Sequence, residues 1–100
     1  MTEFLFVYGT LMNPLVQQRV FGRTAPGEAD KLVGYRKDLI HLGSGVYPII
    51  RPEAGAVVEG MVIQVTRAEL KLMDRYEGPA YQRVRVTLVG GREAWVYTAL

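Results

Sequence analysis

The sequence contains 100 residues, of which 49% are hydrophobic and 22% are charged, and its net charge is +2. This length predicts a single domain over residues 1–100, and the balance of hydrophobic and charged residues excludes a chain that is disordered throughout. The absence of cysteine excludes disulfides, thiol nucleophiles and thiolate metal sites. Because this is compatible with a reducing compartment, we expect a cytoplasmic protein.

Membrane and nucleic-acid partners are not expected from this sequence. No stretch approaches the roughly 18 uninterrupted apolar residues of a membrane-spanning helix, and Glu3 stands where a signal peptide would be basic. The 12 basic residues are dispersed along the chain, whereas nucleic-acid binding favours a basic stripe with interleaved aromatic residues. Binding of single-stranded nucleic acid stays open at one short segment, because Tyr81, Arg83 and Arg85 would share a strand face.

The first part of the chain predicts a strand followed by a helix. The apolar run over residues 3–8 is typical of a buried strand that ends at Gly9. Asn13 and Pro14 are the residue types favoured at the N-cap and at the first position of a helix. Together they predict a short helix over residues 15–21, which a glycine then ends.

The middle of the chain predicts a loop and then several strands. Pro26 and Gly27 indicate the loop, and the glycines on either side of Ser44 indicate a turn. Pro48 interrupts a short strand, which indicates an edge strand or a bulge at that point. The predicted ranges are 23–30 for the loop, and 32–42 (one strand or a bent pair), 46–51 and 57–65 for the strands.

The last part of the chain predicts a hairpin, with strands over residues 81–89 and 93–99 joined by Gly90 and Gly91. Around six short strands with two helices among them predict an α+β fold. A doubly wound parallel sheet would need more crossover helices than the sequence offers. We therefore expect a small mixed, mostly antiparallel sheet that curls toward a β-barrel, with two short flanking helices.

Residues 66–77 form the clearest predicted helix. Thr66 and Glu69 have the spacing of a capping box, and Gly78 followed by a proline is a typical helix stop. Because both ends are defined, the residues that share a face of the helix can be assigned. The apolar half of the helical wheel contains Leu70, Leu72, Met73 and Tyr76.

Glu77 is the charged residue that does not join the charged half of this helix. It follows Met73 by four positions and Leu70 by seven, so it falls on the apolar face. Burial and the negative end of the helix dipole would both raise the pKa of its carboxyl group, toward the range in which a carboxylate exchanges protons at neutral pH. Asp74 lies nearer to the solvent side and is less suited to this task. The alternative is a frayed last turn with Glu77 in water.

Several motifs together resemble the γ-glutamylcyclotransferase-like (AIG2-like) family. The stretch Tyr8-Gly9-Thr10-Leu11, after an N-terminal strand, resembles the opening motif of that family. The segment from Asp74 to Gly78 resembles its Asp-x-x-Glu-Gly block. Further matches follow the same order along nearly the whole chain: Tyr47-Pro48, Tyr81, Arg83 and Val96-Tyr97.

The resemblance implies a cavity lined by the first loop and by Glu77. It also implies a reaction in which the α-amino group of a γ-glutamyl substrate attacks its own γ-carbonyl, forms 5-oxoproline and releases an amine or amino acid. Glu77 would be the catalytic base and acid. Because the substrate supplies the nucleophile, no cofactor or metal is expected, and His41 is expected to be a structural residue on a strand.

The loop after the first strand is expected to bind the α-carboxylate of such a substrate. Gly9 permits a close approach of the backbone to a ligand, and successive backbone N–H groups can form an anion-binding nest. The tyrosines of the motifs are expected to line the pocket, and the hydroxyl of Tyr81 is also expected to hydrogen-bond Glu77 or the substrate. The expected substrate-binding residues are Tyr8, Gly9, Thr10, Leu11, Tyr47 and Tyr81.

Two other functions stay open at this stage. A protein on the same scaffold could bind a small carboxylate without turnover. The strand face that carries Tyr81, Arg83 and Arg85 could instead bind single-stranded nucleic acid through arginines and an aromatic ring. The sequence does not indicate the oligomeric state, and the leaving group could be an amine, an amino acid or a lysine-type fragment.

Overall fold

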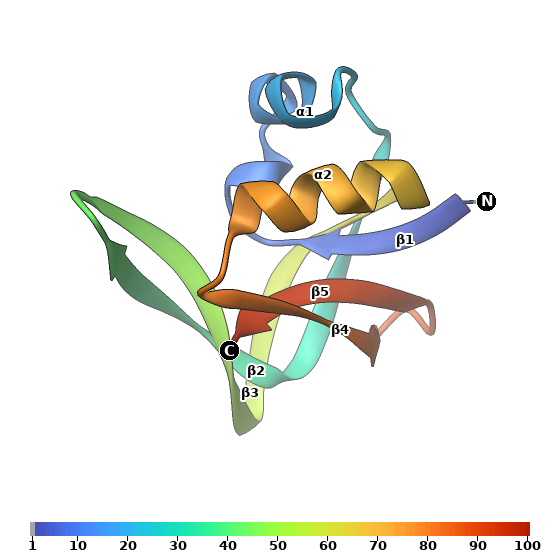
Figure 1. Cartoon of the computed structure of the whole chain (residues 1–100). Helices are drawn as coiled ribbons and strands as arrows, with labels where there is room; N and C mark the ends of the chain where they lie inside the picture. The colour runs from blue at the N-terminus through green and yellow to red at the C-terminus, as the bar shows by residue number, and fades with distance from the viewer. Residues whose placement is uncertain (1) are drawn as a thin grey trace.

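The computed structural model describes residues 2–100, which form five strands, two α-helices and one short 3-10 helix (Figure 1). The strands are β1 (Thr2–Val7), β2 (Gly27–Leu42), β3 (Gly45–Thr66), β4 (Tyr81–Thr87) and β5 (Glu93–Ala99). The helices are η1 (Thr10–Met12), α1 (Pro14–Phe21) and α2 (Arg67–Glu77). Among the described residues, no helix is long and apolar enough to cross a membrane.

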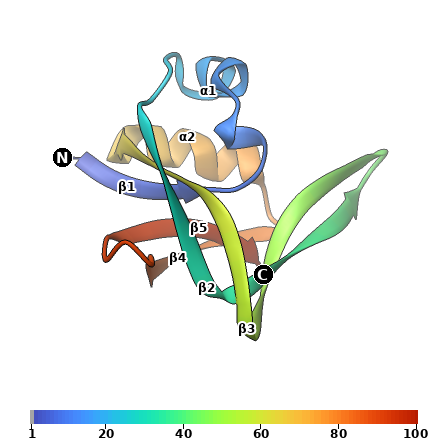
Figure 2. The same cartoon turned by 180° about the vertical axis from the view of Figure 1, so that it is seen from behind.

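All five strands belong to one sheet with the order β2-β3-β1-β5-β4. The β1–β5 pair is parallel and the other three pairs are antiparallel. Both helices lie over one side of this curled sheet (Figures 1 and 2). The predicted α+β class, with a mostly antiparallel curled sheet and two helices, is therefore confirmed.

Hydrophobic residues pack against both faces of the central strand β1. Leu5 and Val7 belong to a core on the helix side, together with residues of α1 and α2. Phe6 and Tyr8 belong to a second core, which the curled sheet encloses. Because successive side chains of a strand point to opposite faces, a strand between two cores is apolar at every position. This explains the uninterrupted apolar run in the sequence.

The hairpin of β2 and β3 bends, and its outer part projects away from the body of the protein (Figures 1 and 2). A register shift between Val33 and Tyr35 marks the bend. Gly34, at this point, has a φ of 92°, a conformation that favours glycine. We call residues 35–52, the part of the hairpin beyond the bend, the arm.

Two predictions for this region are wrong. Residues 27–30 do not end a loop but begin β2, because they pair with the far end of β3. The segments 46–51 and 57–65 belong to one strand, since glycines bend the strand without ending it. Pro48 does lie at an edge, because β3 pairs with β2 there and meets β1 only from residue 61 onward.

Both α-helices begin at the predicted caps. Asn13 caps α1 by accepting a hydrogen bond from the Leu15 N–H (2.8 Å), and Gly22 ends that helix with a φ of 79°. Thr66 and Glu69 form both halves of the capping box of α2. Local side-chain contacts therefore fix where the chain enters each helix.

The face of α2 that is covered by the rest of the protein is narrower than predicted. Leu70 and Met73 are buried, whereas Leu72 and Tyr76 are 42% and 43% exposed. The core contacts follow a strip centred on Leu70 and Met73, so residues at the borders of the apolar half reach solvent or the cavity described below. Glu77 lies one turn after Met73 and continues this strip.

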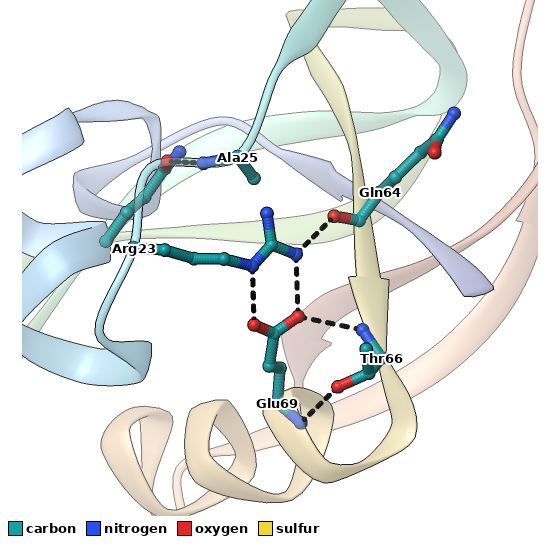
Figure 3. Close-up of polar contacts among 6 residues, drawn as sticks. Arg23, Ala25, Gln64, Thr66 and Glu69 are labelled. Atoms are coloured by element: carbon teal, nitrogen blue, oxygen red, sulfur yellow. Dashed lines mark hydrogen bonds and ion pairs between the residues drawn. The ribbon is translucent and has the colours of Figure 1, made fainter. Parts of the chain in front are cut away.

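An ion pair joins the loop after α1 to the start of α2 (Figure 3). Arg23 donates two hydrogen bonds of 2.7 Å to the carboxylate of Glu69 and one of 3.1 Å to the Gln64 carbonyl. The same carboxylate accepts the Thr66 N–H at 2.9 Å. The hydrogen bonds from Arg23 hold the pKa of Glu69 below its usual range. Glu69 thus serves the local helix cap and a long-range contact together.

We predict that Glu69→Ala destabilises the protein more than Thr66→Ala does. Thr66→Ala removes one cap hydrogen bond and should lower the free energy of unfolding by about 1 kcal/mol. Glu69→Ala also leaves Arg23 without its carboxylate, so we expect a loss of about 2–3 kcal/mol. Urea denaturation measures both changes, with Glu93→Ala, at an exposed position of β5, as the control. An effect of Glu69→Ala no larger than that of the control would contradict this role.

Candidate active site

A cavity of about 370 Å³ opens beside the C-terminal end of α2, between the loop after β1 (the first loop), the outer part of the arm and the start of β4. All residues predicted to form the site line this cavity, although their roles in binding and catalysis stay predictions. They are Tyr8, Gly9, Thr10, Leu11, Tyr47, Glu77 and Tyr81. The remaining lining residues are Phe6, Val7, Leu42, Pro48, Tyr76 and Tyr97.

Glu77 reaches the cavity from the last residue of α2. Burial raises the pKa of its carboxyl group from 4.5 to about 7, because few water molecules can stabilise the ionised form there. Among the described lining residues there is no arginine, lysine or histidine to oppose this shift. The carboxyl group is therefore close to half ionised at neutral pH, and it can both accept and return a proton. The alternative of a frayed helix end is wrong, since α2 is helical through Glu77.

Asp74, one turn earlier on the same helix, is held in a hydrogen-bond network instead. It accepts hydrogen bonds of 2.9 and 3.1 Å from Arg83 and one of 2.7 Å from the Tyr97 hydroxyl. Burial alone would raise the pKa of Asp74, but these hydrogen bonds outweigh it and hold the pKa below its usual value. The two carboxyl groups of this helix thus differ in their surroundings: hydrogen bonds hold the pKa of Asp74 low, and burial raises that of Glu77.

The first loop contacts both the arm and α2. A Cβ at Gly9 would lie 2.6 Å from Cγ of Pro48, so the close approach of the arm requires a glycine there. The φ of Gly9 is −130°, and the glycine is therefore not needed for a left-handed conformation. The Thr10 and Tyr76 hydroxyl oxygens lie 2.9 Å apart, and this hydrogen bond joins the loop to the last turn of α2.

Tyrosine hydroxyls connect the walls of the cavity. Tyr8 donates a hydrogen bond of 2.6 Å to the backbone carbonyl of Tyr97, and Tyr81 donates one of 2.8 Å to the backbone carbonyl of Pro48. Burial, with a smaller contribution from the charge of Glu77, raises the pKa of Tyr81 to about 12 and that of Tyr8 above its usual range. Both hydroxyls therefore stay protonated. The sequence suggested Glu77 or substrate as the partner of Tyr81, whereas the structure shows the Pro48 carbonyl.

Six lining residues were not predicted as site residues, and three of them show what the sequence did and did not indicate. Tyr76 was assigned to the apolar face of its helix, although its position next to Glu77 could have indicated the cavity. Tyr97 was part of a recognised motif without a role, and it faces the cavity from the central region of the sheet. Leu42 comes from the far end of β2, and only the bend of the arm brings it to the cavity. No local signal in the sequence indicates such a long-range approach.

The basic residues of β4 lie outside this cavity. The guanidinium groups of Arg83 and Arg85 lie 4.4 and 5.1 Å from the ring centre of Trp95. Arg83 is paired with Asp74 at 2.9 Å, and Arg85 lies 3.8 Å from the carboxylate of Glu3. Because these arginines have partners within the protein, the face that suggested nucleic-acid binding offers less uncompensated charge than its sequence implies.

His41 lies outside the lining of this cavity. It lies on a strand, β2, as predicted, and its side chain is exposed there. Within residues 2–100, no group of three or more His, Cys, Asp or Glu side chains could hold a metal ion. The chemistry available in the cavity is therefore that of one carboxyl group, several hydroxyl groups and the backbone N–H groups of the first loop.

Comparison with known proteins gives a family for most of the chain. Residues 5–100 match the family model described as gamma-glutamyl cyclotransferase, AIG2-like. Two Arabidopsis thaliana proteins, AIG2-like protein C and Protein AIG2 C, are 34% and 37% identical to this chain over 86 residues. The alignments cover 85% of this chain and 49% and 51% of those proteins. The chain thus spans about half the length of the curated relatives it matches.

Solved structures share the fold over the whole chain. A solution structure of an Arabidopsis thaliana protein matches with a TM-score of 0.85 at 30% identity, over 99% of this chain and 69% of that chain. A structure described as gamma-glutamyl cyclotransferase matches with a TM-score of 0.82 at 18% identity, over 100% of this chain and 68% of that chain. The second likeness shows the fold alone. Because the family model matches residues 5–100, the chain belongs to the gamma-glutamyl cyclotransferase, AIG2-like family.

Proposed function

We propose that this protein is a γ-glutamylcyclotransferase, which converts a γ-glutamyl amine or amino acid into 5-oxoproline and the released amine. The observation that supports this most is Glu77, a carboxyl group with a pKa of about 7 in a cavity large enough for a small ligand. The reaction needs one proton-exchanging group and no nucleophile from the protein, since the substrate supplies its own. The lining residues offer that combination.

The proposed mechanism assigns every proton to a donor and an acceptor. The substrate α-ammonium group carries three protons, and Glu77 accepts one of them so that the nitrogen can attack the γ-carbonyl carbon. The bond between that carbon and the leaving nitrogen then breaks, while Glu77 returns the proton to the leaving nitrogen. The ring nitrogen keeps one proton and the remaining one also passes to the amine, which leaves as an ammonium ion.

The first loop is the proposed binding site of the substrate α-carboxylate. The hydrogen bonds of η1 begin with the Met12 N–H, which donates to the Gly9 carbonyl at 3.0 Å. The N–H groups of Thr10 and Leu11 precede this bond and therefore have no acceptor within η1. Such N–H groups, next to one another in a cavity wall, suit a carboxylate. Anchoring that end would hold the substrate folded, which favours the intramolecular attack.

We predict that Glu77→Gln lowers kcat/KM about 10²- to 10⁴-fold, because the amide can neither accept nor return the proton. Formation of 5-oxoproline from γ-glutamyl compounds measures this change, with Glu93→Gln as a control for loss of a distant exposed carboxylate. Calorimetry on Glu77→Gln should still show ligand binding. Unchanged turnover in Glu77→Gln would contradict the assigned role, and binding without turnover in the unmodified protein would favour the non-catalytic alternative.

The pH dependence of catalysis should follow the ionisation of Glu77. We predict that kcat/KM falls about tenfold per pH unit below about pH 7, because protonation removes the base, whose pKa is about 7. The substrate α-amino group titrates at a higher pH, so the acid limb reports on the protein. A pH–rate profile measures this limb. A midpoint near 4.5, the usual value for a glutamate, would be incompatible with a buried base.

Glu77→Gln should also change how stability depends on pH. The folded pKa of Glu77, about 7, lies above its usual value of 4.5, so the buried carboxyl group is tolerated without cost when protonated and becomes destabilising as the pH rises toward 7. The free energy of unfolding of Glu77→Gln, relative to that of the unmodified protein, should therefore increase between pH 4.5 and pH 7, by up to about 3 kcal/mol. Denaturation curves at pH 4 and pH 8 measure it. An equal difference at both pH values would show that Glu77 is not buried as an acid.

A further inference from the structure

The charge distribution of the cavity restricts the substrates that it can accept. Glu77 is the one charged side chain among the described lining residues. A substrate whose leaving group carries a carboxylate next to the scissile nitrogen would place a second anion near this acid. Since the lining provides no cationic side chain to pair with it, that anion would lose water without a compensating partner.

Three arginines of the arm and of β4 are already held in ion pairs. On the arm, Arg36 and Arg51 lie 3.0 and 3.4 Å from the same carboxylate oxygen of Asp38. Behind the cavity, Arg83 is paired with Asp74 at 2.9 Å. None of these three arginines belongs to the lining, so recognition of a leaving-group carboxylate by any of them would require an existing ion pair to open.

The outer wall of the cavity is apolar and aromatic. The arm contributes Leu42, Tyr47 and Pro48, and α2 contributes Tyr76. Leu42, Tyr47 and Tyr76 are 38%, 42% and 43% exposed, so they form a partly solvated mouth rather than a closed core. A ligand ring placed against these side chains would remove apolar surface from water and could pack against two aromatic rings.

The backbone of the arm holds the Tyr47 ring in place. A Cβ at Gly45 would lie 2.6 Å from a carbon of that ring, so the ring lies directly over the glycine. Gly45 does not have a left-handed conformation, so alanine is compatible with its backbone and would conflict only with the ring. Gly45 is therefore a positioning residue for Tyr47.

We propose that Leu42, Tyr47, Pro48 and Tyr76 form a leaving-group subsite for an uncharged aromatic group, and that the preferred substrates are γ-glutamyl derivatives of arylalkylamines. This rests on the cyclotransferase function proposed above. With γ-glutamyl-phenethylamine, the α-nitrogen forms a bond to the γ-carbon, the bond from that carbon to the phenethylamine nitrogen breaks, and phenethylamine leaves with the two protons that the α-nitrogen loses. The reaction needs no further reactant.

Three substrates test this subsite. Compared with γ-glutamyl-phenethylamine, γ-glutamyl-phenylalanine adds a carboxylate and γ-glutamyl-ethylamine lacks the ring. We expect kcat/KM for the phenethylamine compound to exceed that for each of the others at least tenfold. An equal or higher value for γ-glutamyl-phenylalanine overturns the subsite and leaves the proposed function intact, because 5-oxoproline still forms.

Binding to Glu77→Gln separates the failure of the subsite from the failure of the proposed function. If none of the three compounds gives 5-oxoproline with the folded protein, the cyclotransferase function is wrong. The affinities of the same compounds for Glu77→Gln then decide the subsite. Tightest binding of the phenethylamine compound supports it, and equal affinities overturn it.

Variants of the arm test the role of Tyr47. Tyr47→Ala and Gly45→Ala should each raise KM for γ-glutamyl-phenethylamine about tenfold and leave KM for γ-glutamyl-ethylamine within about twofold. The matched control is Leu39→Ala, since Leu39 is 62% exposed on the arm and does not line the cavity. If Tyr47→Ala changes KM equally for both substrates, Tyr47 does not contact the aromatic leaving group and the subsite is overturned. This outcome does not depend on how Gly45→Ala affects the arm.

Discussion

Burial of one carboxyl group at the end of α2 is the constraint on which the rest of this site depends. An ionised Glu77 at neutral pH is costly because its surroundings are tyrosines and apolar side chains. The same surroundings bring the pKa of the carboxyl group close to neutral pH, as its proposed role of base and acid requires. The fold must therefore supply stability elsewhere, through two packed cores, defined helix caps and the Arg23–Glu69 contact.

The sheet brings the parts of the cavity together from distant segments of the chain. The central strand β1 ends at the first loop, and the neighbouring strand β5 places Tyr97 beside it. The arm reaches back toward this point, where Pro48 packs on Gly9 and accepts a hydrogen bond from Tyr81. The lining of the cavity therefore comes from four segments that only the folded chain assembles.

Local signals in the sequence predicted much of this arrangement. Asn13, Thr66 and Glu69 have the chemistry of caps, so the helix starts were predictable, and the position of Glu77 on the apolar strip followed from helix geometry. The long-range features were not predictable in this way. The single long strand β3 and the approach of Leu42 depend on how glycines bend a hairpin, and the exposure of Leu72 depends on how wide a strip of α2 the rest of the protein covers.

The measurement that tests this account most directly is the titration of the Glu77 carboxyl group by carbon NMR. Comparison with the spectrum of Glu77→Gln assigns the signal without any assumption about substrate or activity. We predict a midpoint at about pH 7, because burial disfavours the ionised form. A midpoint near 4.5, the value of a glutamate in water, would contradict the central claim.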